Sequence, residues 1–372
     1  MTPEIAEQLG RLTPEQRAAL RKRLRNNQAP PESPVSTIDR LSLYFFPAAG
    51  DNAADYYDMI LRAAERADEA GFAAVWLPER HFVRFGGFSP NPAVLAAAVA
   101  ARTDRIGIRA GSVAAPLHHP VRIAEEWSVV DNLSRGRVGV SFASGWHPDD
   151  FVLARTDHAT RRDDTLAAIT QVRSLWSGAA ESYPSTAGGE RAVRIRPRPI
   201  QQRLPVWLTA AGSPDTFVAA GSAGCGVMTA LLGQTLGQLR ENVERYRAAW
   251  RAAGHPGSGD VVVMTHAYVS DRPDLEAVLR PAMHDYLEGF LAQTAETGGA
   301  DRQTLLEQAY QSYLHGTSLL GTPAKARRAL AELSDAGADE VGCLVDFGLP
   351  ADTVLDGLSA LAALIERVEV SA

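Results

Sequence analysis

Three residues that can carry charge or a proton follow a buried strand in WLPERHFVRFGGFSPNP, residues 76–92. The apolar run 73–77 ends there, and Glu79, Arg80 and His81 come next. Charged side chains are rarely buried unless they are paired, and an imidazole suits acid–base work near neutral pH. The cluster therefore predicts catalytic residues at this strand end. A solvated loop is the alternative until the other strand ends are considered.

The ends of other apolar runs carry small residues, hydroxyls and imidazoles. These ends read AGSVAAPLHHP (110–120), SFASGWHPDD (141–150), TAAGSPDTF (209–217), MTALLG (228–233) and MTHAYVS (264–270). Small residues let the backbone approach a flat ligand closely. His266 is a second acid–base candidate, and strand alternation leaves open whether it faces the interior of the fold or packs under a helix.

The segment GSPDTF has the pattern of a phosphate-binding helix start. Gly212 and Ser213 precede Pro214, which suits the first turn of a helix. Free N–H groups at a helix N-terminus, with the hydroxyls of Ser213 and Thr216, can bind a phosphate. An ordinary helix cap is the alternative, because Ser-Pro-Asp is common there.

The elements that must position these residues alternate between strands and helices. Apolar runs of strand type are 41–46, 73–77, 105–113, 137–143, 205–210, 226–230, 260–269 and 340–347. Helices are predicted near 54–70, 92–102, 119–133, 160–177, 214–222, 235–253, 272–290, 323–336 and 351–368. This alternation predicts an α/β fold with parallel strands, and eight strands fit a (β/α)₈ TIM barrel with its active site at the C-terminal strand ends. An open doubly wound sheet is the alternative, but no G-x-G-x-x-G follows the first strand.

Composition narrows the classes of partner. The chain has 372 residues, a net charge of −7 and no basic block, so we expect no nucleic-acid partner. No apolar run is long enough to cross a membrane, and no signal pattern opens the chain, which predicts a cytoplasmic protein. Cys225 and Cys343 are expected to be buried thiols.

Several chemistries lack their motif. No metal set is apparent, and the adjacent His118 and His119 are interpreted as loop or helix-cap residues. No G-x-S-x-G elbow or Walker loop occurs. No lysine lies on a predicted strand, which disfavours a Schiff-base aldolase.

The first 35 residues differ from the rest. LTPEQRAALRKRL (12–24) has a complete helix start but few apolar positions, and a proline-rich stretch follows it. We therefore expect residues 1–35 to form a helical extension or linker and residues 36–372 to form the barrel domain. An ordinary terminal extension is the alternative.

Many motifs, in order, resemble the bacterial-luciferase-like flavin monooxygenases. They include PERHF, FGG, PNP and, most specifically, HPVRIAEEWSVVDNLSRGRVGVSFASGW (119–146). WLTAAGSPDTF, LLGQTLGQL, SLLGTP and DEVGCLVDFG are similar to the branch of that family found in nonribosomal-peptide and polyketide biosynthesis. The resemblance covers about residues 41–366, and the segment 12–24 is similar to linkers of peptide-synthetase assembly lines.

This resemblance implies a TIM barrel that binds reduced FMN supplied by a separate reductase. The flavin would react with O₂ to give a C4a-hydroperoxide that oxidises the substrate. Expected partners are a small-molecule or carrier-protein-bound substrate, the reductase, and a peptide synthetase or carrier protein, with the enzyme itself a homo-oligomer. The implied cofactor-binding residues are Gly111, Ser112, Ala143, Ser144, Gly145, Arg161, Gly212, Ser213, Thr216 and Thr229.

Several positions qualify this resemblance. The family often has a non-proline cis peptide at the position of Gly111-Ser112, and Arg161 matches a charge partner for the phosphate. Ala143 stands where bacterial luciferase has a reactive cysteine. Arg80 stands where that enzyme has its histidine base, which leaves the base open among His81, Glu79 and His266 and argues against light emission.

An insertion at 291–320, after the seventh strand and its helix, is expected either to close the site or to form a surface loop with a short helix. Tyr310, Tyr313 and His315 are its candidate site residues. Three other functions stay open beside the monooxygenase: a flavin or deazaflavin oxidoreductase that moves hydride without oxygen, a non-catalytic docking barrel, and flavin-free chemistry.

Overall fold

Eight parallel strands close into a barrel. The structure, a computed structural model, describes residues 38–47, 53–154, 156–292 and 302–365. The strands run in the order β11-β1-β2-β3-β4-β7-β8-β9, and pairing of β9 with β11 completes the ring. Their bounds are β1 Arg40–Tyr44, β2 Ala74–Leu77, β3 Gly107–Ala114, β4 Val138–Ala143, β7 Val206–Ala210, β8 Gly226–Ala230, β9 Val261–Val269 and β11 Glu340–Leu344. The predicted TIM barrel is therefore confirmed.

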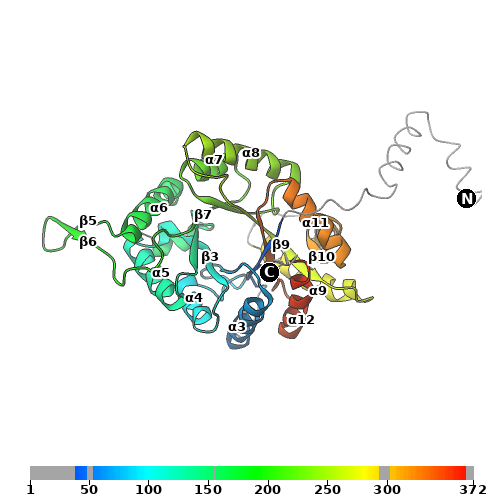
Figure 1. Ribbon diagram of the computed structural model, residues 1–372. Helices are drawn as coiled ribbons and strands as arrows, with labels where there is room; N and C mark the ends of the chain where they lie inside the picture. The colour runs from blue at the N-terminus through cyan, green and yellow to red at the C-terminus, as the bar shows by residue number, and fades with distance from the viewer. Residues whose placement is uncertain (1–37, 48–52, 155, 293–301, 366–372) are drawn as a thin grey trace, which may run out of the picture. The chain divides into compact units, whose positions relative to one another are not determined.

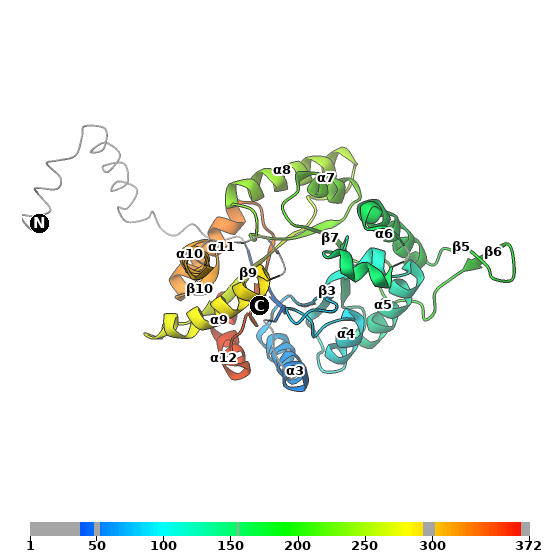
Figure 2. The same ribbon diagram turned by 180° about the vertical axis from the view of Figure 1, so that it is seen from behind.

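Helices surround this barrel (Figure 1; Figure 2 gives the reverse view). They are α3 Ala53–Ala70, α4 Pro92–Ala100, α5 Pro120–Ser134, α6 Arg161–Ser177, α7 Pro214–Ser222, α8 Leu236–Ala252, α9 Leu275–Leu291, α10 Arg302–His315, α11 Pro323–Asp335 and α12 Ala351–Ala362. Several begin where the sequence has a cap: Asn91 accepts two backbone N–H bonds before α4, and Thr235 forms a capping box with Gln238 at α8.

Some strand ends and one hairpin differ from the prediction. β1 ends at Tyr44 and β11 at Leu344, earlier than expected, because the chain leaves the sheet to form the loops of the barrel mouth. An antiparallel hairpin of β5 Glu181–Pro184 and β6 Glu190–Val193 follows α6 and extends away from the barrel in both views. Its turn contains Gly188 and Gly189, both with positive φ, a pairing that favours hairpins.

The interior of the barrel below the mouth is filled by aromatic and paired charged side chains. The rings of Trp76 and Trp207 pack edge to face with centroids 5.1 Å apart. The Arg109 guanidinium lies 4.8–4.9 Å from the centroids of both indoles and donates to the fully buried Glu340 carboxylate at 2.8 and 2.9 Å. A buried charge of this kind is tolerated because it is paired and hydrogen-bonded. This layer gives the mouth a solid floor.

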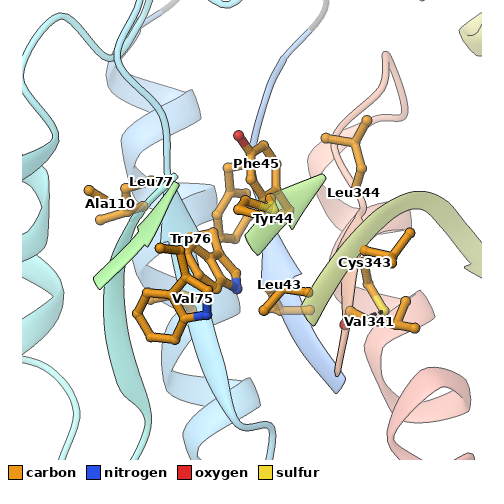
Figure 3. Packing of buried hydrophobic residues seen from close by; sticks show 14 of the residues in the cluster. Leu43, Tyr44, Phe45, Val75, Trp76, Leu77, Ala110, Val341, Cys343 and Leu344 are labelled. Atoms are coloured by element: carbon orange, nitrogen blue, oxygen red, sulfur yellow. Dashed lines mark hydrogen bonds between the residues drawn. The ribbon is translucent and has the colours of Figure 1, made fainter. Parts of the chain in front are cut away.

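Gly111 of β3 lies where the packed aromatic layer reaches the barrel mouth. A Cβ at this position would lie 2.8 Å from the Tyr44 ring and 3.1 Å from the Cβ of Trp76. The Tyr44 hydroxyl donates to the Gly111 carbonyl. Figure 3 shows Tyr44 and Trp76 among the packed side chains of β11, β1 and β2. Only glycine therefore leaves room for both aromatic side chains here.

The predicted insertion contains the helix α10 and the short strand β10 Leu319–Gly321, which pairs with β9. Tyr310 is fully buried beside His284 and Arg280, so it packs in the core and does not line the mouth. His315 is exposed. Tyr313 alone among the three predicted residues reaches a candidate catalytic residue, as described below.

Two predictions fall partly or wholly outside the described residues. Residues 1–35, the predicted extension, lie outside them, as does the start of the insertion at 293–301. The division between extension and barrel domain therefore stays a prediction. Among the described residues, no helix is long and apolar enough to cross a membrane. Cys225 and Cys343 are buried free thiols, as expected.

Candidate active site

Glu79 joins two imidazoles at the mouth of the barrel. It follows β2, and its Oε1 lies 2.8 Å from Nε2 of His81 and 2.7 Å from Nε2 of His118. Its Oε2 accepts the Ala114 backbone N–H at 2.9 Å. Since a carboxylate only accepts, both Nε2 atoms carry hydrogen, and each Nδ1 is the ring atom that can gain or lose a proton. One buried carboxylate therefore fixes the tautomers of both rings.

The electrostatics of this cluster favour an ionised Glu79 carboxylate beside a protonated His118 imidazole. The Glu79 side chain is 1% exposed, and burial alone would raise its pKa. Hydrogen bonds from His118 and His81 outweigh that effect and hold the pKa of Glu79 below its ordinary value. Burial likewise lowers the pKa of His118, but the Glu79 carboxylate outweighs it and leaves that pKa raised. The arrangement is thus suited to holding a proton next to a fixed negative charge.

Arg80 points to a different wall of the mouth. Its guanidinium is buried, lies 3.5 Å from the Asp150 carboxylate and stands 4.3 Å from the centroid of the Trp146 ring. Burial lowers the pKa of Arg80. Trp146 in turn stacks on Phe290 with centroids 6.1 Å apart. Arg80 therefore packs against the partly exposed Trp146 ring, whereas Glu79 and His81 belong to the hydrogen-bonded cluster with His118.

His266 lies inside the barrel in a cage of aromatic rings. β9 pairs with β11 in the register that sets Val262 against Glu340 and His266 against Leu344, so His266 shares the interior face with Glu340. Its ring packs edge-on against Tyr286, Tyr313 and Phe347, with centroids 4.7–5.4 Å apart. The interior placement left open by the sequence is the one observed.

Burial keeps His266 uncharged. It lowers the pKa of His266 to about 3, and Nε2 is buried with no hydrogen-bond partner among the described residues. A neutral imidazole with a vacant nitrogen can hydrogen-bond a ligand but cannot act as a cation near neutral pH.

Hydroxyls and small residues line the β3, β4 and β7 ends. The peptide bond Gly111–Ser112 is cis. The Thr209 hydroxyl bonds to those of Ser112 and of Ser141, the latter at 2.8 Å. Ala143 ends β4, and Ser144 and Gly145 follow it. Gly145 has φ +84°, and a Cβ there would lie 2.9 Å from the Phe151 ring.

The predicted phosphate segment opens α7. Ser213 is its N-cap residue, and its side chain makes no capping hydrogen bond. Gly212 has φ +99°, and its carbonyl accepts from Asn242 at 3.1 Å. The Thr216 N–H donates to the Ser213 carbonyl at 3.1 Å. The Ser213 hydroxyl is therefore not used as a cap, whereas the Gly212 carbonyl and the Thr216 N–H already have partners.

Thr229 has a structural partner set. Its hydroxyl donates to the Ala210 carbonyl at 2.7 Å and accepts from the Gln234 amide at 2.8 Å. Thr229 therefore stabilises the turn after β8, and its hydroxyl is engaged by the protein itself at both contacts.

Arg161 begins α6 beside an unsatisfied imidazole. Its Nη1 donates to the His158 carbonyl at 2.7 Å and lies 3.4 Å from the Nδ1 of that ring. The Nε2 of His158 is buried without a hydrogen-bond partner among the described residues. Arg173, further along α6, donates to carbonyls just after α7, so the two helices are neighbours. No hydrogen bond or ion pair joins Arg161 itself to Ser213 among the described residues.

Three residues of the mouth were not predicted from the sequence as site residues. His118 was interpreted as a loop or cap residue, but its ring bonds to Glu79; the cap is His119, which accepts from the Val121 N–H. His158 is the second. Asp346 follows β11 and accepts from the Phe46 N–H and the Tyr56 hydroxyl, both at 2.8 Å. Burial raises the pKa of Asp346 to about 7.

A hollow of about 690 Å³ lies at the opposite end of the barrel. It is lined by Pro205, Gly226 and Asp260, which stand at the starts of β7, β8 and β9. Ligands of this fold bind at the C-terminal strand ends, so this hollow is separate from the candidate site. Among the described residues, no group of three or more His, Cys, Asp or Glu side chains is arranged to hold a metal ion.

Known sequences similar to this chain include monooxygenases. The flavin-dependent trigonelline monooxygenase oxygenase component of Acinetobacter baylyi is 25% identical over 243 residues, 63% of this chain and 65% of that protein. The 4-hydroxyprotoasukamycin monooxygenase of Streptomyces nodosus subsp. asukaensis is 27% identical over 285 residues, 76% of this chain and 72% of that protein. The match thus spans just under two thirds of the first relative. Both relatives are named as monooxygenases, and the first is named as flavin-dependent.

Solved structures share the fold. The monooxygenase RslO1 from Streptomyces bottropensis superposes with a TM-score of 0.77 at 24% identity, covering 88% of this chain and 98% of that one. An F420-dependent secondary alcohol dehydrogenase superposes with a TM-score of 0.69 at 15% identity, covering 89% and 100%. The sequence profile described as "Luciferase-like monooxygenase" matches residues 40–340. The chain therefore belongs to the luciferase-like monooxygenase family.

Proposed function

We propose that this protein is the oxygenase of a two-component monooxygenase, which takes reduced FMN from a separate reductase and uses O₂ to oxidise an intermediate of nonribosomal-peptide or polyketide biosynthesis. The observation that carries this proposal is the buried Glu79 cluster at the mouth of a luciferase-like barrel. The relative named as an "oxygenase component" supports a reductase partner, and the Streptomyces relative supports a secondary-metabolite substrate.

The residues at the starts of α6 and α7 fit the phosphate of FMN. Arg161 brings a positive charge, and its contact with the Nδ1 of His158 leaves a hydrogen on the buried Nε2, which no other described residue contacts by a hydrogen bond. The Ser213 hydroxyl is not used as a cap. A charged donor, a ring N–H and a hydroxyl are groups that bind phosphate. Gly212, Ser213 and Arg161 therefore remain the proposed phosphate residues, with His158 added.

The remaining cofactor-binding candidates surround the proposed place of the flavin ring. Ser112, with Gly111 before it, and the segment Ala143-Ser144-Gly145 present small side chains and hydroxyls at neighbouring strand ends. Bound reduced FMN would supply the electrons that activate O₂. The chain supplies binding, orientation and exclusion of water. Thr216 stays a proposed contact, whereas Thr229 is proposed only to support the turn after β8.

The protein's own catalytic groups divide the work. His81 is proposed to accept or return a proton at Nδ1, because Glu79 holds its Nε2 hydrogen. His266 is proposed to hydrogen-bond the substrate through Nε2, since burial keeps the ring neutral. The aromatic rings around it exclude water, which protects a reactive flavin from side reactions. Arg80 is proposed to hold the wall that includes Trp146.

A deazaflavin-dependent hydride transfer is the second candidate function. It is favoured by the superposition on an F420-dependent alcohol dehydrogenase. It would need neither O₂ nor a reductase. A tethered substrate on a carrier protein is a finer part of the first proposal, and its support is the resemblance of residues 12–24 to assembly-line linkers.

The proposed reaction is tested by the fate of oxygen. The full-length protein is supplied with NADH, FMN, a flavin reductase and ¹⁸O₂, together with carrier-bound aminoacyl thioesters, and the carrier is read by intact mass. Incorporation of one ¹⁸O atom supports the proposal. His81→Ala should retain FMN binding but lower coupled product on the order of 10²-fold. Oxidation without ¹⁸O, or activity with F420 alone, would favour the hydride-transfer function.

A further inference from the structure

Two histidines compete for one carboxylate oxygen in this site. Nε2 of His81 and Nε2 of His118 lie 2.8 Å and 2.7 Å from the same Oε1 of Glu79. With both rings neutral, the cluster carries the single negative charge of Glu79. One added proton makes it neutral, and a second makes it positive and sets two imidazolium rings against each other. The two rings are therefore coupled electrostatically through one carboxylate oxygen, and a proton on one ring disfavours a proton on the other.

The surroundings decide which ring holds that proton. The His118 side chain is 23% exposed and that of His81 is 10% exposed, so a cation is better hydrated on His118. Glu126 of α5 adds a second negative charge near His118. Glu126 also pairs with Arg122 at 2.8 Å, and Arg80, the other charged residue beside the cluster, pairs with Asp150 at 3.5 Å.

We propose that His118 is a positioning residue that carries the proton balancing Glu79, and that it thereby keeps His81 neutral and able to accept a proton. The same arrangement holds His81 in one tautomer, because Glu79 accepts from its Nε2. His118 acts only through Glu79 and His81 and needs no contact with flavin or substrate. The role of His118 in turnover rests on the proposed function. The effect of His118 on the protonation of His81 can be measured without flavin.

The experiment follows the histidine rings by NMR in the flavin-free, full-length protein labelled in its nine histidines. Signals are assigned from single-histidine variants, and the pH is raised from 5 to 9. We expect the His118 ring to lose its proton at higher pH than the His81 ring. In His118→Gln, which retains an N–H donor for Glu79 but cannot hold a proton, the titration of His81 should move up by about one pH unit.

Two further variants separate charge from packing. His118→Lys restores a positive charge beside Glu79 and should return the His81 titration toward that of the wild type. His119→Asn is the matched control: His119 caps α5 and does not touch Glu79, and asparagine is a good cap, so His81 should titrate unchanged.

The turnover readout is the pH profile of coupled product formation. Its acidic limb should move to higher pH in His118→Gln, by the same amount as the His81 titration, and should not move in His119→Asn. The proposal is overturned if His81 holds its proton to higher pH than His118, or if His118→Gln leaves the His81 titration unchanged. If the His81 titration shifts as expected in His118→Gln but the protein shows no oxygenation, the proposal about His118 is retained and the proposed function is rejected.

Discussion

Glu79 is the residue on which the mouth cluster depends, and its contribution to stability should depend on pH. The pKa of Glu79 is lowered in the folded chain, so its stabilisation is present above its unfolded pKa and is lost as pH falls through the folded value. The pKa of His118 is raised, so its stabilisation is present below its unfolded pKa and is lost as pH rises through the folded value. Both are fully present only between about pH 4.5 and 6.5.

Glu79→Gln should therefore destabilise the protein most near pH 5.5. We expect a loss of about 2 kcal/mol or more in the free energy of unfolding, because the charge that strengthens these hydrogen bonds is removed and one accepting oxygen becomes a donor. Denaturant unfolding at pH 5.5 and pH 9 checks this. Glu65→Gln, which breaks the surface pair with Arg102, is the control and should change little. A larger loss at pH 9 than at pH 5.5 would contradict the linkage.

His266→Phe separates a ligand-binding role from a packing role. Phenylalanine keeps an aromatic ring in the cage and removes a buried nitrogen that has no hydrogen-bond partner in the described part of the chain, so the unfolding free energy should not fall. Product formation should fall at least about tenfold if Nε2 bonds the substrate. Normal kinetics in a stable variant would make His266 a packing residue. Because the pKa of His266 is about 3, it should contribute no inflection to the pH profile between 5 and 8.

Residue types at strand ends predicted part of this site but not its partners. Glu79 and His81 could be chosen because they follow a buried run at once. The bond from His118 to Glu79 could not, since it joins positions 39 apart in the sequence and depends on the turn of η1, Ala115–Leu117. Arg80 was grouped with its neighbours by sequence, but the structure turns it toward Asp150.

At the scale of elements, Gly111 couples β3 to the floor of the mouth. Gly111→Ala would place a Cβ 2.8 Å from the Tyr44 ring, which is held by its own bond to the Gly111 carbonyl. We expect a loss of about 1–3 kcal/mol in unfolding free energy from overpacking, and weaker FMN binding. Gly237→Ala in α8 is the control, because its Cβ would have only an ordinary contact, 3.9 Å from the Thr235 hydroxyl; it should be neutral or stabilising. Equal stability of both variants would show that the mouth adapts freely.

The strands and helices of the barrel were largely predictable because hydrophobic runs and caps are local signals. β2, for example, is buried on both faces and reads as the continuous apolar run 73–77. The hairpin of β5 and β6 was missed because its strands are short and exposed, although Gly188-Gly189 was a usable turn signal. The prediction that Tyr310 lines the mouth was wrong, because the face of α10 that is buried depends on its packing against the neighbouring helix α9, which the sequence pattern of α10 alone does not reveal.

At the scale of the whole molecule, residues 1–35 should matter for substrate delivery and little for the barrel. Deleting them should leave the melting temperature and FMN affinity nearly unchanged. Turnover of a carrier-bound substrate should slow, while turnover of a small thioester mimic should not. Differential scanning fluorimetry and steady-state kinetics on both substrates check this. Equal loss on both substrates would assign the segment to the fold, and efficient oxidation of an untethered metabolite would reject carrier delivery.

The assembly state and the location of the protein in the cell stay predictions. A homo-oligomer and a cytoplasmic protein were expected from the sequence. Light scattering of the full-length protein tests the first.

The use of reduced FMN at the mouth of the barrel is tested most directly by one anaerobic titration. The full-length protein and its Ser213→Asp variant are titrated with reduced FMN and, separately, with reduced F420, and binding is followed by fluorescence. We expect reduced FMN to bind more tightly than F420, and Ser213→Asp to weaken FMN binding at least about tenfold, since it sets a negative charge against the phosphate. Tighter binding of F420, or unchanged FMN affinity in the variant, would contradict the proposed cofactor or its proposed phosphate site.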